Sequence, residues 1–177
     1  MIAYRHADPR FPFLWESENE AVGRWNATGD GPVQYLTDTP DGAWAEFLRH
    51  EEITTPEDLA TVRRAIWAID IGDEQPDARP ELGKQTLFGN RDSYARCQRE
   101  ARRLRTQGAV SLVAPSAALL PSGASGYRCS GGLVPGPSRD GRVYVLFGAR
   151  PRAIGWQVVF RGRPATDLLD KVRHFSS

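Results

Sequence analysis

Three side chains that can bind and polarise a substrate recur at equal intervals near the start of this 177-residue chain. Tyr35 lies eleven residues after Arg24, and Glu46 lies eleven residues after Tyr35. The planar guanidinium of arginine grips phosphate or carboxylate, and tyrosine offers a flat stacking face with a hydroxyl. Glutamate binds sugar hydroxyls or stabilises a cationic transition state. The three residue types together indicate a phosphorylated, ribose-bearing substrate, although equal spacing of such common residues is a weak signal.

An ordered series of short motifs extends this pattern along most of the sequence. The motifs are Tyr4-Arg5, Gly23-Arg24-Trp25-Asn26, Pro32-Val33-Gln34-Tyr35, Ala45-Glu46 with His50 behind it, and Pro115-Ser116. In this order they closely resemble the RES domain, the toxin half of RES–Xre toxin–antitoxin pairs. The sequence departs from the family pattern at Ser125 to Ser130, which replace a segment rich in asparagine in many members.

The resemblance implies a fold and a reaction. The implied fold is α+β and similar to that of ADP-ribosyltransferases, with a split, mostly antiparallel sheet, flanking short helices and a cleft for NAD. The implied enzyme is an NAD phosphorylase or NAD glycohydrolase, which cleaves the nicotinamide–ribose bond with inorganic phosphate or water as acceptor. NAD is then the substrate, phosphate an optional co-substrate, and no cofactor or metal is required. The implied protein partner is an Xre-type antitoxin.

The resemblance also gives roles to five residues. Glu46 is expected to bind the ribose hydroxyls and stabilise positive charge, as in glycoside cleavage, and Tyr35 to orient the nicotinamide end. Arg5 and Arg24 are expected to hold the pyrophosphate or the attacking phosphate, and Ser116 to form a hydrogen bond near the same pocket. Taken alone, these residues leave other roles open: a surface ion pair for Arg5, a solvated helix position for Glu46 and a turn cap for Ser116.

Two other functions stay open from the sequence. One is transfer of ADP-ribose to a macromolecular target. The other is a non-catalytic module that binds a partner through the arginine-rich segment 91–106. We interpret the outer face of that segment as a solvated surface, and the formal net charge of +1 gives no reason to expect direct nucleic-acid binding.

Composition bounds the remaining possibilities. The chain is 40% hydrophobic and 25% charged, which is typical of a globular protein, and we expect one RES domain over residues 1–177. Cys97 and Cys129 are not spaced as metal ligands, and without a signal peptide they indicate reduced thiols. No apolar stretch approaches the roughly 20 residues that cross a bilayer. We therefore expect a cytoplasmic protein.

The elements that must position the candidate residues follow from apolar periodicity and helix-start signals. Thr39-Pro40 and Thr55-Pro56 each predict a helix start, because a capping hydroxyl precedes a proline at the first helical position. Residues 91–106 predict a longer helix with Cys97 on its inner face, and Thr166 begins a short final helix. Strands are predicted at 2–6, 32–37, 65–71, 109–114, 142–148 and 154–161, the last two paired across the turn at 149–153. Loops or connections are predicted at 7–20, 72–89 and 121–141.

Overall fold

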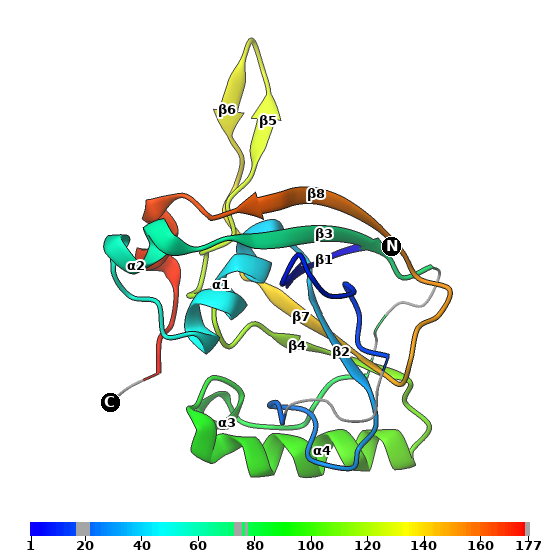
Figure 1. Cartoon of the computed structure of the whole chain (residues 1–177). Coiled ribbons are helices and arrows are strands. Elements are labelled where there is room, and N and C mark those ends of the chain that lie inside the picture. The colour runs from blue at the N-terminus through cyan, green and yellow to red at the C-terminus, as the bar shows by residue number, and fades with distance from the viewer. Residues whose placement is uncertain (17–21, 73–75, 77, 176–177) are drawn as a thin grey trace.

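The computed structural model describes residues 1–16, 22–72, 76 and 78–175. Six strands form one antiparallel sheet in the order β4-β7-β2-β1-β3-β8 (Figure 1). These strands are β1 (Ile2–Ala7), β2 (Val33–Thr37), β3 (Arg64–Asp70), β4 (Ser111–Pro115), β7 (Arg142–Phe147) and β8 (Ile154–Gly162). A separate hairpin consists of β5 (Tyr127–Cys129) and β6 (Leu133–Pro135).

The helices are short, and two of them begin where the sequence predicts. Thr39 accepts a hydrogen bond from the Gly42 backbone N–H (3.1 Å), and Thr55 accepts one from Asp58 N–H (3.2 Å). Each threonine therefore satisfies a backbone donor that the first turn leaves unpaired. The helical elements are α1 (Pro40–His50), α2 (Pro56–Thr61), α3 (Lys84–Leu87), η1 (Arg91–Ser93), α4 (Tyr94–Thr106) and η2 (Thr166–Lys171), where η1 and η2 are 3₁₀ helices.

The sheet is nearly split in the middle. β1 and β2 meet at one register pair, Tyr4 with Thr37, whereas six pairs join β1 to β3 and five join β2 to β7. Two three-stranded halves therefore diverge from that point. The α+β prediction, with a split antiparallel sheet and short flanking helices, is confirmed.

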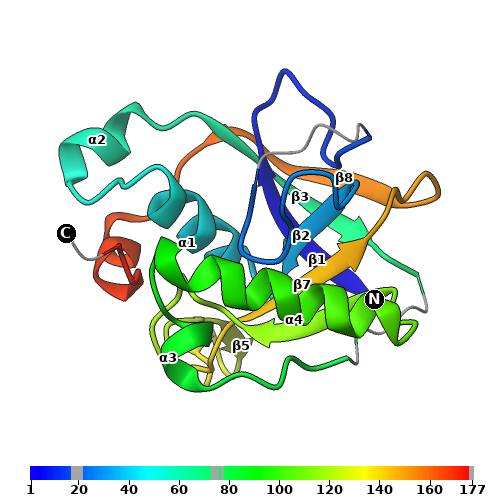
Figure 2. The same cartoon turned by 90° about the horizontal axis from the view of Figure 1, so that it is seen from below.

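Each half of the sheet has its own helical cover. α4 lies along the half that contains β7 and β4 (Figure 2), and its Cys97, Ala101 and Leu104 pack in one buried cluster with Leu112 and Val145. α1 and η2 share a second cluster with β3. Cys97 is fully buried, which confirms its interpretation as a core residue.

The predicted pairing of the last two strands is wrong. β7 pairs with β2 and β4, and β8 pairs with β3 at the far edge of the sheet. The connection at 148–153 must therefore pass β2, β1 and β3, a distance of about 19 Å at the usual strand spacing. Six extended residues span that distance. A short connection alone therefore does not make a hairpin, and Figure 1 shows this segment running along the sheet's end.

Two predicted connections contain regular structure. Segment 121–141 forms the β5–β6 hairpin, which projects from the body in Figure 1 and turns through Gly131 and Gly132 at positive φ. All but one of its strand residues are exposed, so they lack the apolar alternation that marks a half-buried strand. Segment 72–89 contains α3, a single turn without a capping side chain. Of the predicted loop 7–20, residues 8–16 contain no helix or strand, and 17–20 lie outside the described residues.

Candidate active site

A cavity of about 670 Å³ opens where β1 and β2 diverge. This volume lies within the usual range of about 300–1,000 Å³ for small-molecule sites. Four of the five residues predicted for the site line it, namely Arg5, Arg24, Tyr35 and Glu46. Ser116 does not line the cavity, although its neighbours on both sides do.

Glu46 projects from α1 into the cavity wall and is half-buried. Burial raises the pKa of its carboxyl group, and this effect outweighs the hydrogen bond from Ser116 and the charge of Arg49, which both lower it. The other residues of α1 around it are mostly buried. The alternative of a solvated helix position is therefore excluded, and the helix presents one acidic group to the cavity.

Ser116 lies directly behind Glu46 and performs two tasks. Its hydroxyl donates to Glu46 Oε1 (3.0 Å) and accepts from the backbone N–H groups of Ala118 (3.2 Å) and Leu119 (3.0 Å). It is therefore both a turn cap and the group that orients the carboxylate. The side chain is 2% exposed, so it acts on the cavity through Glu46.

Tyr35 anchors the turn that carries Arg24. Its hydroxyl accepts from the Trp25 backbone N–H (2.7 Å) and donates to Asn26 Oδ1 (2.7 Å). The turn is so close that a Cβ at Gly23 would lie 2.6 Å from the Tyr35 hydroxyl oxygen. Glycine is therefore required at position 23, and the ring of Tyr35 is held in a fixed position at the cavity.

Arg24 is 8% exposed and is bound on several sides. Its guanidinium donates to the carbonyl oxygens of Thr86 (3.1 Å) and Gly89 (2.7 Å) and to the hydroxyl of Ser93 (2.9 Å), and it stacks on the ring of Tyr94. It thus fixes the connection before α4 while it contributes positive charge to the cavity.

Arg5 reaches the cavity from β1 and is oriented by Gln34, a residue that sequence reasoning missed. Gln34 is fully buried; its Oε1 accepts from Arg5 Nη1 (3.0 Å) and from Trp15 N–H (2.9 Å). Its Nε2 donates to the Trp15 carbonyl (2.7 Å). One amide therefore holds both Arg5 and the aromatic segment at residues 11–15. The available sequence signal was a glutamine between Val33 and Tyr35, in a strand whose other residues are mostly apolar.

Replacing Gln34 with leucine should release that segment. The change keeps the side-chain volume and removes three hydrogen bonds, and we expect a loss of about 2 kcal/mol in the free energy of unfolding. Limited proteolysis should then cut near Phe11 to Trp15 faster than in the wild type. Gln157→Leu, at an exposed position on β8, is the matched control and should leave the cutting rate unchanged.

Arg49, one turn after Glu46 on α1, is a second residue that sequence reasoning missed. It is 3% exposed and donates to the carbonyl oxygens of Ala117, Arg173 (2.9 Å) and Gly89 (3.0 Å). Burial and the nearby charge of Arg24 lower its pKa. The three-residue offset from Glu46, which places both side chains on neighbouring parts of one helix face, was the signal that could have found it.

His6 and Arg64 complete the wall on the other side of the cavity. Burial, followed by the charge of Arg64, holds the pKa of His6 well below its ordinary value, so the ring is neutral near pH 7. Its Nδ1 lies 3.4 Å from Arg64 Nη2, and its ring packs on Phe47 at 5.2 Å between centroids. Among the described residues, the cavity lining therefore combines four carboxylates with four guanidinium groups, those of Asp8, Glu16, Glu46 and Glu51 and of Arg5, Arg24, Arg49 and Arg64.

Two kinds of site are not found in the part of the chain that the structure describes. No group of three or more His, Cys, Asp or Glu residues there is arranged to hold a metal ion. None of the described helices is both long and apolar enough to cross a bilayer.

The family model of the RES domain matches residues 2–167, and the chain belongs to that family. Among solved structures, the fold is similar to a chain of the M. tuberculosis MbcT–MbcA toxin–antitoxin complex, with a TM-score of 0.57 and 17% sequence identity. The match covers 88% of this chain and 83% of that one. A comparison with curated proteins gave no match.

Proposed function

We propose that the protein is a RES-type toxin that degrades NAD by breaking the nicotinamide–ribose bond. The observation that supports this most is Glu46, a carboxylate held by Ser116 in the wall of a cavity that also presents arginines. An anionic group at that position favours a sugar that becomes cationic, while the guanidinium groups favour the phosphates of the same molecule.

The proposed reaction breaks the bond between the ribose anomeric carbon and the nicotinamide nitrogen. The bonding electron pair leaves with the nitrogen, and nicotinamide departs as a neutral molecule. Water or inorganic phosphate then forms a bond to the anomeric carbon. Water loses a proton to solvent and yields ADP-ribose, whereas phosphate yields ADP-ribose 1″-phosphate. Glu46 stabilises the positive charge that develops on the ribose, as carboxylates do in glycoside cleavage.

The remaining residues bind and orient. Arg5 faces the phosphates, Arg24 and Arg49 add positive charge behind them, and the fixed ring of Tyr35 orients the nicotinamide end. Ser116 holds Glu46 in place. This assignment makes Ser116 and Gln34 positioning residues, because their contacts are with Glu46 and Arg5.

The test is to incubate the purified protein with NAD, with and without inorganic phosphate, and to resolve the products by mass. Loss of NAD with release of nicotinamide supports the proposal, and the mass of the second product identifies the acceptor. If a folded protein leaves NAD intact, the proposal fails. Labelled NAD that becomes attached to protein would instead identify a transferase with a macromolecular target.

We also propose a protein antitoxin of the Xre type as partner, acting with the toxin in the cytoplasm, where NAD is available. The supporting observation is the similarity of fold to a chain from a toxin–antitoxin complex. Co-expression with a neighbouring Xre-type gene should relieve growth arrest and yield a stable complex on size exclusion.

Removal of the Ser116 hydroxyl should alter the pH dependence of catalysis. Its hydrogen bond lowers the pKa of Glu46, so Ser116→Ala should raise that pKa further and move the acid limb of the rate profile to higher pH. We expect a roughly tenfold lower rate near pH 7 and a loss of about 1 kcal/mol in stability from the missing cap. Ser116→Thr keeps the hydroxyl and serves as control. A uniform loss at every pH would instead indicate direct contact with substrate.

A further inference from the structure

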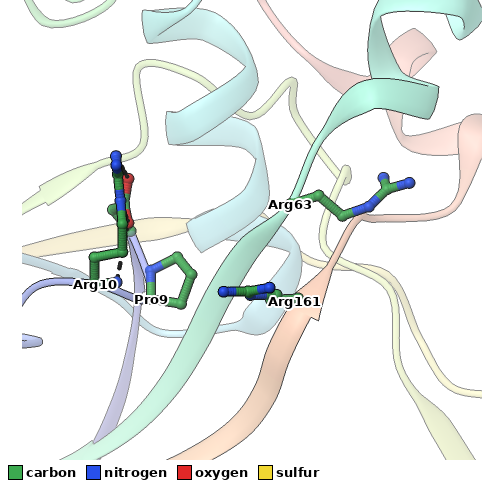
Figure 3. A pocket seen from close by; sticks show the side chains of 5 residues that line it. Pro9, Arg10, Arg63 and Arg161 are labelled. Carbon is green, nitrogen blue, oxygen red and sulfur yellow. Dashed lines mark hydrogen bonds and ion pairs between the residues drawn. The ribbon is translucent and has the colours of Figure 1, made fainter.

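A second hollow, of about 450 Å³, adjoins the cavity where the end of β1, the start of β3 and the end of β8 lie together (Figure 3). Its lining consists of Asp8, Pro9, Arg10, Arg63 and Arg161. Figure 3 shows Arg161 between Pro9 and Arg63. Three arginines from separate segments of the chain therefore line one hollow.

The single carboxylate of this lining is already neutralised. Arg10 donates through Nε to Asp8 Oδ1 (3.0 Å) and through Nη2 to Oδ2 (2.9 Å). Arg64 approaches the same Oδ2 at 3.6 Å. These hydrogen bonds hold the pKa of Asp8 well below its ordinary value, so the carboxylate stays ionised and paired.

Arg63 and Arg161 have no carboxylate partner among the described residues. Arg63 Nη1 donates to the carbonyl oxygens of Ala60 (2.9 Å) and Val62 (2.6 Å), and Arg161 stacks on the ring of Phe160 at 5.2 Å. The group of four arginines and one aspartate therefore has a local excess of positive charge. Like charges held close together repel, and a bound anion would offset that repulsion.

An irregularity in the pairing of β8 with β3 affects the direction of the Arg161 side chain at the hollow. Along β8, Val159 and Gly162 are three positions apart, whereas their partners Ile66 and Arg64 on β3 are two positions apart. The extra residue makes a β-bulge, a feature that redirects a side chain near the edge of a sheet. Arg161 belongs to this bulged stretch.

The hollow is connected to the candidate active site through two residues. Asp8 lines both the hollow and the cavity, and Arg64, which pairs with Asp8, lines the cavity. An extended molecule that occupies the cavity and leaves it past His6 and Arg64 would reach the hollow with its far end.

We propose that this arginine hollow is a phosphate-binding subsite at the rim of the cavity. Arginine forks fit the oxygens of a phosphoryl group, and excess positive charge beside a small opening suits a compact dianion. The phosphoryl group comes either from the adenosine end of a dinucleotide whose other end lies at Glu46, which rests on the proposed function, or from free inorganic phosphate.

The experiment measures binding by calorimetry with three ligands: ADP-ribose, 2′-phospho-ADP-ribose and inorganic phosphate. The protein variants are wild type, Arg161→Gln, Arg63→Gln/Arg161→Gln and the control Arg99→Gln, an exposed arginine on α4. A fourth variant, Arg5→Gln, weakens the main cavity and leaves the hollow intact.

In the nucleotide arm, 2′-phospho-ADP-ribose should bind the wild type about tenfold more tightly than ADP-ribose. A charge-assisted hydrogen bond at an exposed site changes affinity by little more than a factor of about ten. The advantage should disappear in the double variant and persist in Arg99→Gln. In the free-phosphate arm, the affinity for inorganic phosphate should fall about tenfold in the double variant and stay unchanged in Arg99→Gln, and Arg5→Gln should keep the binding site that the double variant loses. Added salt should weaken either interaction.

If each of the three ligands bound the double variant with the same affinity as the wild type, the proposed subsite would be refuted. Failure of ADP-ribose to bind the wild type would count against the proposed function, and the free-phosphate arm would still decide whether the hollow holds an anion. The two failures are therefore separable.

Discussion

Replacing Glu46 with glutamine should remove catalysis while leaving the protein folded. Glutamine keeps an oxygen to accept the hydrogen bond from Ser116 and loses the negative charge that we assign to stabilising the ribosyl cation. Loss of one such electrostatic contact costs about 10²–10³ in rate. The measurement is the rate of NAD loss at saturating substrate, with and without phosphate.

The same variant should be at least as stable as the wild type near neutral pH. Burial raises the pKa of Glu46 above its ordinary value of 4.5, so the folded state binds a proton more tightly than the unfolded chain. Wild-type stability therefore falls as pH rises from about 4.5 through the raised pKa, and glutamine avoids this penalty. The measurement is the free energy of unfolding of both proteins at pH 4 and pH 7. At pH 4 the variant should be no more stable than the wild type, and at pH 7 it should be equally stable or more stable.

Wild-type activity should follow the opposite trend. The ionised carboxylate is the useful form, so the rate should rise as pH increases through the Glu46 pKa. Full activity of Glu46→Gln, in a protein whose spectrum and unfolding match the wild type, would remove the carboxylate from the mechanism and favour a module that binds a partner.

Replacing Arg24 with alanine should have the largest effect on stability. The side chain is almost fully buried, and it donates hydrogen bonds to Thr86, Gly89 and Ser93 and a longer one to Cys97 Sγ (3.9 Å). Hydrogen bonds to a charged group contribute about 1.5–3 kcal/mol each. We expect about 3–5 kcal/mol, which for a chain of this length lowers Tm by roughly 6–20 °C.

Two further variants separate this structural role from phosphate binding. Arg24→Lys keeps the charge and loses the planar fork, so its Tm should fall by a smaller amount. Arg99→Ala changes an exposed arginine and should leave Tm within about one degree. If Arg24→Ala kept the wild-type Tm and lost only affinity for NAD or phosphate, the arginine would serve the ligand alone.

Local chemistry made part of this fold predictable. The threonine–proline pairs fixed the starts of α1 and α2 because capping and proline geometry depend on adjacent residues. Side chains alternate between the two faces of a strand, which predicts that Val33 and Tyr35 share one face. Both pack in the buried cluster beneath α4. The same reasoning mispaired β7 with β8, because strand partners are chosen by burial across the whole sheet. The exposed β5–β6 hairpin carries no such signal.

The candidate site was predictable to a similar degree. The resemblance to the RES domain selected Arg5, Arg24, Tyr35 and Glu46, which the fold brings to one cavity. The position of Ser116 behind Glu46 depends on where β4 ends relative to α1, and no spacing in the sequence contains that information. The contacts of Arg49 and Gln34 likewise join segments distant in the chain.

The contacts of Arg49 also determine the order in which the site can form during synthesis. Its guanidinium joins α1 to carbonyl groups at residues 89, 117 and 173, up to 124 positions away. A ribosome-bound chain that has released only its first hundred residues already contains Arg5, Arg24 and Glu46, but it lacks Ser116 and two of the three carbonyls. The chain therefore carries its acidic group long before the pocket can close around it. The contacts that complete the candidate site are therefore missing until synthesis has passed residue 173.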